Sequence, residues 1–319
     1  MGLDMYGAPD LAFDFEAAQR VVTAADGAAD ALEGQTGSRA SYVTAAETDF
    51  RSYYSELFAA NAASTAGDRR ELAVRLWEVS AFMGKLVAAA REENARRRRA
   101  REYKARVEQR RRNWVDATWD QIFGEEPPPR EQAKAAPVFP AEVVRQAPRS
   151  PLAGTGAGSM TSTRPADLRA SASGSAGLDA AVRDWPSRLR SAAGSFMATC
   201  DFGGIDVAPV VVGFEKWLAA NAEDVRWANI VAAAFEASGA GSGVATVSDA
   251  ALGAALAAAG VNARRDDLAI DPAQAFGGVP TTGFVNDPVN TSTGNFIEPE
   301  SDLLFAGASA SLSLSRMYN

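Results

Sequence analysis

The sequence predicts a mainly α-helical protein that ends in a short β-segment, and three observations predict it. Apolar residues recur with seven-residue spacing in the first part of the chain, apolar stripes return after residue 178, and period-two spacing appears only near the end. We therefore expect an N-terminal antiparallel helical bundle or hairpin with a long basic helix over 1–124 and a flexible linker over 125–177. A second small helical domain is expected over 178–277 and a β-segment over 278–319.

The first helical unit is predicted from three seams of apolar residues, whose steps alternate between four and three. Glycine-containing joints at Gly34–Gly37 and at Ala66-Gly67, the latter followed by the N-cap candidate Asp68, separate them. Short joints make neighbouring helices antiparallel, so we expect a three-helix assembly. The residues expected inside it are Phe15, Val22, Phe50, Leu57, Leu76 and Met83.

The third helix is expected to run on through a strongly basic stretch to Phe123, because no Gly or Pro intervenes after Gly84. Residues 91–112 contain eleven Lys or Arg and four Glu, within a chain of net charge −8. Three interpretations stay open: a solvated charged helix, contact with an acidic surface of another protein or copy, and nucleic-acid binding. Nucleic-acid binding usually also needs aromatic side chains that stack on bases, and Tyr103 is the only such residue within the basic stretch. The candidate interaction surface is Arg96, Arg97, Arg98, Arg99, Arg110, Arg111 and Arg112.

Proline and small residues predict where the first unit ends. Pro127–Pro129 stops a helix, and the residues up to 177 contain few large apolar side chains, so a flexible tether is expected. In the second domain we expect a helix interrupted at Pro186, a helix that begins anew at Asn221, and a short helix opened by Ser248 and closed by Gly260.

Composition excludes several chemistries. The chain has no histidine and one cysteine, Cys200, so Ser–His and Cys–His nucleophile pairs and His-ligated metal sites are excluded within it. We predict no catalytic, cofactor-binding or metal-binding residue and no enzyme, with a carboxylate-based hydrolase as a minor alternative. No apolar run has transmembrane length, and the first residues lack the features of a signal peptide.

The last forty residues carry the most specific motif of the chain. A turn-forming Asp-Pro pair and a Thr-Gly-Asn turn precede short alternating apolar runs, which predicts two or three short strands. The motif resembles the entry segment of Rhs/YD-repeat polymorphic toxins, in which a β-shell encloses a toxic C-terminal domain. This resemblance implies a fragment or a separate front end that carries no toxic domain. The residues that carry it are Asp287, Pro288, Val289, Asn290, Thr293, Gly294, Asn295, Phe296, Arg316 and Tyr318.

The alanine-lined hairpin over roughly 10–110 resembles, in architecture, the WXG-type proteins exported by type VII secretion. The sequence departs from that pattern, because no tryptophan is followed by x-Gly and the turn is Gly34-x-x-Gly37. The resemblance implies secretion without a signal peptide, with the protein cytoplasmic before export. The block over 178–277 resembles the segment that precedes the β-shell in actinobacterial members of the toxin group.

Together these patterns predict a non-enzymatic secretion and docking region of an Rhs/YD-repeat polymorphic toxin that acts in interbacterial competition. Its expected partners are a secretion apparatus or helical chaperone and the β-shell of the same toxin, whose entrance it would occupy; self-association is left open. The alternative is a structural or regulatory protein that binds nucleic acid through its arginine-rich helix.

Overall fold

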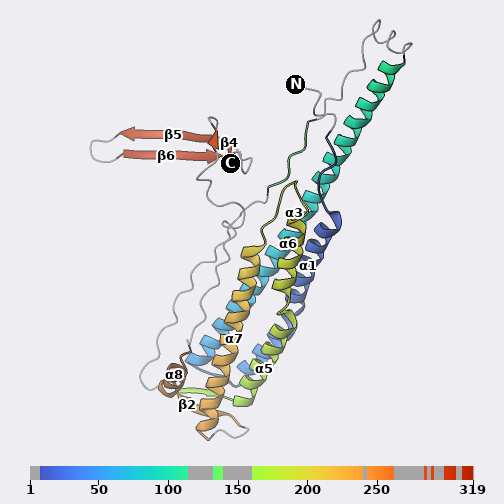
Figure 1. Ribbon diagram of the computed structural model, residues 1–319. Helices are drawn as coiled ribbons and strands as arrows, with labels where there is room; N and C mark the ends of the chain where they lie inside the picture. The colour runs from blue at the N-terminus through green and yellow to red at the C-terminus, as the bar shows by residue number, and fades with distance from the viewer. Residues whose placement is uncertain are drawn as a thin grey trace. The chain divides into compact units, whose positions relative to one another are not determined.

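The computed structural model describes residues 8–113, 132–138, 160–239 and 243–261, and the strand residues 284–285, 289–290, 298–306 and 311–318. The chain divides into two compact units (Figure 1). One comprises residues 1–137 and 144–270, and the other residues 138–143 and 271–319. The described part is mainly helical, with only short two-stranded sheets, as the sequence predicted.

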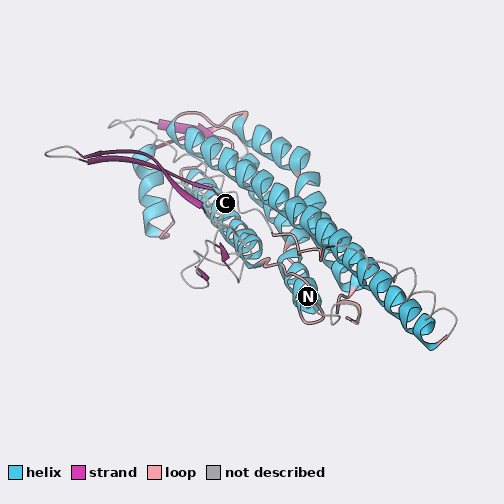
Figure 2. Cartoon of the chain, turned by 90° about the horizontal axis from the view of Figure 1, so that it is seen from above, coloured by secondary structure: helices cyan, strands magenta, loops and turns pink. Residues whose placement is uncertain are grey.

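Four long helical rods, two of which are interrupted, make up most of the described part of the first unit (Figures 1 and 2). The first rod packs antiparallel to the second, and the third packs antiparallel to the fourth; the first and third also contact each other, as do the second and fourth. In chain order the rods are α1 (Phe15–Gly34) with α2 (Thr36–Glu47), α3 (Tyr53–Arg112), α5 (Pro165–Val182) with α6 (Trp185–Met197), and α7 (Ala208–Ala237).

The first reversal of the chain lies elsewhere than the sequence predicted. Gln35, between α1 and α2, keeps a near-helical backbone with φ −82° and ψ −7°, so the rod continues instead of folding back. The chain reverses at residues 48–52, where Ser52 takes φ 82°. The predicted turn at Gly34–Gly37 is therefore wrong, and the observed turn contains no glycine.

Two further predicted breaks are also wrong, because tertiary contacts override local propensity. Ala66-Gly67 lies inside the continuous helix α3, and Asp68 is buried in that helix instead of capping one. Asn221 lies inside α7, where its buried amide donates to Asp179 Oδ1 at 2.8 Å. The first hairpin is thus two rods, not a three-helix assembly.

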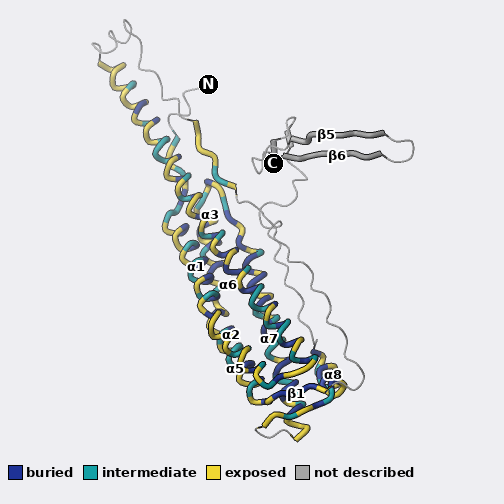
Figure 3. Tube along the Cα trace, turned by 180° about the vertical axis from the view of Figure 1, so that it is seen from behind, coloured by how far each residue is buried: buried dark blue, intermediate teal, exposed yellow. Residues whose placement is uncertain are grey.

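Most of the predicted interior of the first unit is confirmed. Phe50, Leu57, Leu76 and Met83 are buried, whereas Phe15 and Val22 are only half-buried. The buried face of α1 is wider than a single line of apolar residues because both α3 and α6 pack on it. Its buried residues are Ala17, Ala18, Val21, Ala24, Ala25, Ala28, Ala29 and Leu32. In Figure 3, buried and exposed residues alternate along the helices of the first unit.

The predicted linker and the predicted separation of two helical domains do not match this unit. Residues 160–163 form strand β1 (Met160–Thr163), which pairs antiparallel with β2 (Ala245–Ser248), and α5 follows at once. Buried Leu168 anchors α5, whose small residues allow close packing on α2 and α7. Both helical blocks therefore share one compact unit. Residues 125–131 and 139–159 of the predicted linker lie outside the described residues.

The local sequence signals at Pro186, Ser248 and Gly260 predicted helix boundaries correctly. Helix α5 ends at Val182, and α6 begins with Pro186 in its first turn, as the proline predicted. Ser248 caps α8 (Asp249–Ala258) by accepting a hydrogen bond from the Ala251 amide. Gly260 follows that helix with φ 64°, the conformation for which glycine was expected there.

The second unit contains the predicted β-segment. Strand β3 (Phe284–Val285) pairs with β4 (Val289–Asn290), and β5 (Glu298–Ala306) pairs with β6 (Ser311–Tyr318), both antiparallel. The longer pair runs from Glu298 opposite Tyr318 to Ala306 opposite Ser311, with a register shift between Ser301 and Leu303.

Candidate functional site: the basic end of α3 and the bundle cavity

The basic stretch forms the C-terminal part of helix α3, which is continuous through Arg112 as predicted. The helix has 60 residues and is therefore roughly 90 Å long. Its predicted continuation to Phe123 lies outside the described residues. Arg98, Arg99 and Arg110–Arg112 are exposed, whereas Arg96 and Arg97 are half-buried.

Arg96 and Arg97 converge on a buried carboxylate of the same helix. Glu93 is 2% exposed and accepts from Arg96 Nε at 2.8 Å, Arg96 Nη2 at 2.6 Å and Arg97 Nε at 2.9 Å. The amide of Lys134 adds a fourth bond at 3.0 Å. The hydrogen bonds from Arg96 lower the pKa of Glu93 to about 2, although burial alone would raise it.

The same end of α3 holds the segment that precedes α1. Arg97 Nη1 donates to the Pro9 carbonyl at 2.9 Å. Arg101 donates to the Ala8 carbonyl at 2.7 Å and to Asp10 Oδ1 at 2.6 Å. These arginines therefore act as an intrachain clamp on the N-terminal segment. The position of Glu93 three and four residues before Arg96 and Arg97 indicates their ion pairs, but no sequence signal predicted the contacts with residues 8–10.

A second group of arginines lies within the bundle, where the side chain of Arg39 is 11% exposed and that of Arg69 is 3% exposed. The Arg39 guanidinium donates to Asp179 Oδ1 and, through Nε, to Gln35 Oε1 at 2.9 Å. It also lies over the ring of Trp217, 4.9 Å from the centroid. Asp179 in turn accepts from Asn221. This network connects the break between α1 and α2 to α5 and α7.

Arg69 secures the same break from helix α3. Its side chain is 3% exposed, and Nη1 donates at 2.6 Å both to the Leu32 carbonyl and to Thr36 Oγ1. Glu33 Oε1 lies 3.9 Å from the same nitrogen. Burial lowers the pKa of Arg69, and nearby Arg39 lowers it further, while Glu33 opposes them.

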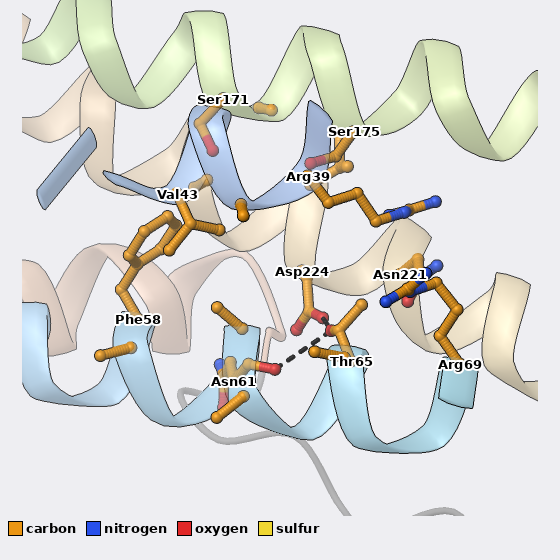
Figure 4. Close-up of a pocket in the computed structure, with 18 of the residues that line it drawn as sticks. Arg39, Val43, Phe58, Asn61, Thr65, Arg69, Ser171, Ser175, Asn221 and Asp224 are labelled. Carbon is orange, nitrogen blue, oxygen red and sulfur yellow. Dashed lines mark hydrogen bonds between the residues drawn. The ribbon is translucent and has the colours of Figure 1, made fainter. Parts of the chain in front are cut away.

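Arg39, Arg69 and Asn221 line one end of a cavity of about 390 Å³ between α2, α3, α5 and α7. Figure 4 shows Arg39, Arg69 and Asn221 at one end and the apolar Val43 and Phe58 at the other. Thr65 Oγ1 donates to Asp224 Oδ2 across it at 3.2 Å. Neither this cavity nor its residues had been predicted, because the side chains come from helices far apart in the sequence.

The chemistry of the two sites is that of ion pairing and hydrogen bonding. Among the residues that the structure describes, no group of three or more His, Cys, Asp or Glu side chains is placed to hold a metal ion. No helix in that part of the chain is both long and apolar enough to span a membrane.

The predicted C-terminal motif falls partly in the second unit's strands. Val289 and Asn290 form β4, and Arg316 and Tyr318 lie in β6 opposite Glu300 and Glu298. The motif residues outside the described residues are Asp287, Pro288, Thr293, Gly294, Asn295 and Phe296.

Comparison with known families gives a match that covers this motif. Residues 286–319 match the family model described as "Domain of unknown function (DUF6531)". That domain is reported in Rhs/YD-repeat-type proteins. Comparison with curated proteins and with solved structures gives no match.

Proposed function

We propose that this chain is the non-enzymatic secretion and docking region of an Rhs/YD-repeat polymorphic toxin. The match of residues 286–319 to a domain reported in Rhs/YD-repeat-type proteins carries the proposal. In it, the second unit joins the β-shell of the toxin, and the helical unit engages a secretion apparatus or a helical chaperone.

The architecture of the helical unit supports recognition as a folded body. Its two hairpins share one core, and buried polar contacts from Arg39 and Arg69 secure the interrupted first rod. An export signal of this kind would depend on the whole bundle, not on residues 1–124 alone. The alanine-lined hairpin α1–α3 supports export by a type VII route.

The alternative, nucleic-acid binding through the arginine helix, has less support. Arg96, Arg97 and Arg101 make contacts within the chain to Glu93, to main-chain carbonyls and to Asp10. These contacts reduce the positive charge that the stretch offers to a phosphate backbone.

The proposal is tested by attaching a folded reporter enzyme after residue 319 and measuring the reporter in the medium of a bacterium with a type VII system. We expect export with the intact chain and with Thr23→Asp, which changes an exposed position of α1. Val21→Asp places a charge at a fully buried position two residues away and should abolish export. Equal export after deletion of residues 8–261 would contradict the proposal.

A further inference from the structure

The outer face of α3 carries a second apolar seam, opposite the one that packs on α1. Val74, Trp77, Ala81, Gly84 and Ala88 follow one another at spacings of three and four and are all exposed. Val74 is 39% exposed and Trp77 42% exposed. Such spacing places the five residues in one line along the helix, as in the contact line of a helix pair.

Two residues of this outer seam are unfavourable on a helix face that contacts only water. Trp77 exposes a large aromatic ring, and tryptophan is enriched at the centre of protein interfaces. Gly84 weakens a helix interior, yet a Cβ added there would meet no atom within 4 Å. No close approach within the part of the chain that the structure describes therefore explains this glycine, whereas a second helix approaching from outside would.

We propose that two copies of the chain associate through this outer seam, with their α3 helices antiparallel and the two-fold axis near Ala81. In this register Val74 of one copy lies opposite Ala88 of the other. The ring of Trp77 then packs against the space left by the partner's missing Cβ at Gly84. A symmetric interface of this kind uses the same patch twice, so each contact occurs twice.

Charged residues beside the seam favour the same register. Arg70 comes opposite Glu92, and Glu78 comes opposite Lys85, each pair again formed twice. The two carboxylates already contact one cation of their own chain, since Glu78 binds Arg75 at 2.8 Å and Glu92 binds Lys134 at 3.0 Å. Their side chains are nevertheless 41% and 60% exposed, which leaves oxygen surface for a second cation.

The charge distribution also selects the antiparallel direction over the parallel one. A parallel pair in register would place Arg70 beside Arg70 and Lys85 beside Lys85. It would also align the two basic stretches at 91–112, each with eleven Lys or Arg and four Glu. Antiparallel helices direct these stretches away from each other and avoid that repulsion. The inference does not depend on the proposed role in export.

Cysteine cross-linking of the full 319-residue chain tests the register directly. In a Cys200→Ser background, Ala81→Cys lies at the two-fold axis and should form a disulfide-linked dimer under mild oxidation. Val74→Cys and Ala88→Cys should cross-link when the two variants are mixed, but neither should cross-link alone. Efficient cross-linking of Val74→Cys alone and of Ala88→Cys alone would instead show a parallel pair and overturn the proposal.

Sedimentation equilibrium tests the interface itself. Gly84→Gln adds a side chain where the monomer has open space, so it should raise the dimer dissociation constant at least about tenfold while leaving the thermal midpoint of the monomer unchanged or higher. Arg70→Glu should weaken the dimer, and adding Glu92→Arg should restore it. A chain that stays monomeric at about 100 μM, where even weak interfaces are populated, would overturn the proposal. So would a dimer unaffected by Gly84→Gln.

Discussion

The two groups of arginines in the bundle differ in their partners and in how far their side chains are buried. Of the core arginines, Arg69 is buried and Arg39 is largely buried, and both bind polar residues around the break between α1 and α2. The end arginines, Arg96, Arg97 and Arg101, bind one buried glutamate and otherwise main-chain carbonyls and an exposed aspartate. The core arginines secure the break within the first rod, and their side chains are 11% and 3% exposed. Arg97 and Arg101 hold the segment that precedes α1, and their side chains are 23% and 34% exposed.

This difference in burial decides how much each contact contributes. A buried guanidinium that loses its acidic partner keeps its desolvation cost, whereas an exposed one is resolvated by water. The core arginines are therefore expected to be essential for folding. The end arginines are expected to control only the local order of the N-terminal segment, with Glu93 as the intermediate case.

The largest effect is expected at the core arginines. Asp179→Ala removes the carboxylate that Arg39 and Asn221 share and should lower the free energy of unfolding by about 3–5 kcal/mol, because Arg39, whose side chain is 11% exposed, stays largely desolvated without its charge partner. Urea denaturation measures the loss. The double variant Arg39→Met/Asp179→Leu removes both charges and should recover much of it. A loss below about 1 kcal/mol for Asp179→Ala would show that the Arg39–Asp179 pair contributes no more to stability than an exposed ion pair does.

Glu93 should have a smaller and pH-dependent effect. Its pKa is lowered from 4.5 to about 2, so its contribution is complete above pH 4.5 and is lost as the pH falls through about 2. Glu93→Gln should therefore lower the free energy of unfolding by about 3 kcal/mol at pH 7. The difference between the wild type and the variant should approach zero near pH 2. A difference that does not change with pH would show that Glu93 acts through packing and not through its charge.

Arg101 should matter still less for global stability. Its ion pair with Asp10 is largely exposed, so Arg101→Gln should change the free energy of unfolding by less than about 1 kcal/mol. Amide hydrogen exchange near Leu11, whose amide donates to Asn94 at 2.7 Å, should nevertheless become faster. Arg98→Gln is the matched control, because its side chain is 69% exposed. Equal exchange in the two variants would contradict the clamp.

Local sequence signals predicted the elements that residues close in sequence control. Pro186, Ser248 and Gly260 act through their own backbone or a neighbour three residues away, and each prediction held. The helix pattern also predicted the continuous basic helix and most of the core.

Long-range contacts account for the predictions that failed. Gln35 continues a helical rod partly because Arg39 and the carbonyl of Leu178, 143 residues away, bind its side chain. Asn221 stays inside α7 because Asp179 binds its amide. Sequence spacing carries no information about such pairings, so neither the polar core nor the cavity could be predicted.

The smallest effect is expected when exposed arginines of the basic stretch are replaced and nucleic-acid binding is measured. This experiment tests whether the basic end of α3 is a phosphate-binding surface. Because Arg96, Arg97 and Arg101 already contact groups of the chain, we expect only weak binding of duplex or single-stranded DNA at physiological ionic strength. Replacing Arg98 and Arg99 with Gln should then change that binding less than about twofold, as measured by fluorescence anisotropy over a salt series. Tight binding with a steep salt dependence, lost in the Arg98→Gln/Arg99→Gln variant, would favour the nucleic-acid alternative. The same variant should leave the unfolding midpoint unchanged, since both positions are exposed. That control distinguishes loss of a binding surface from loss of the fold.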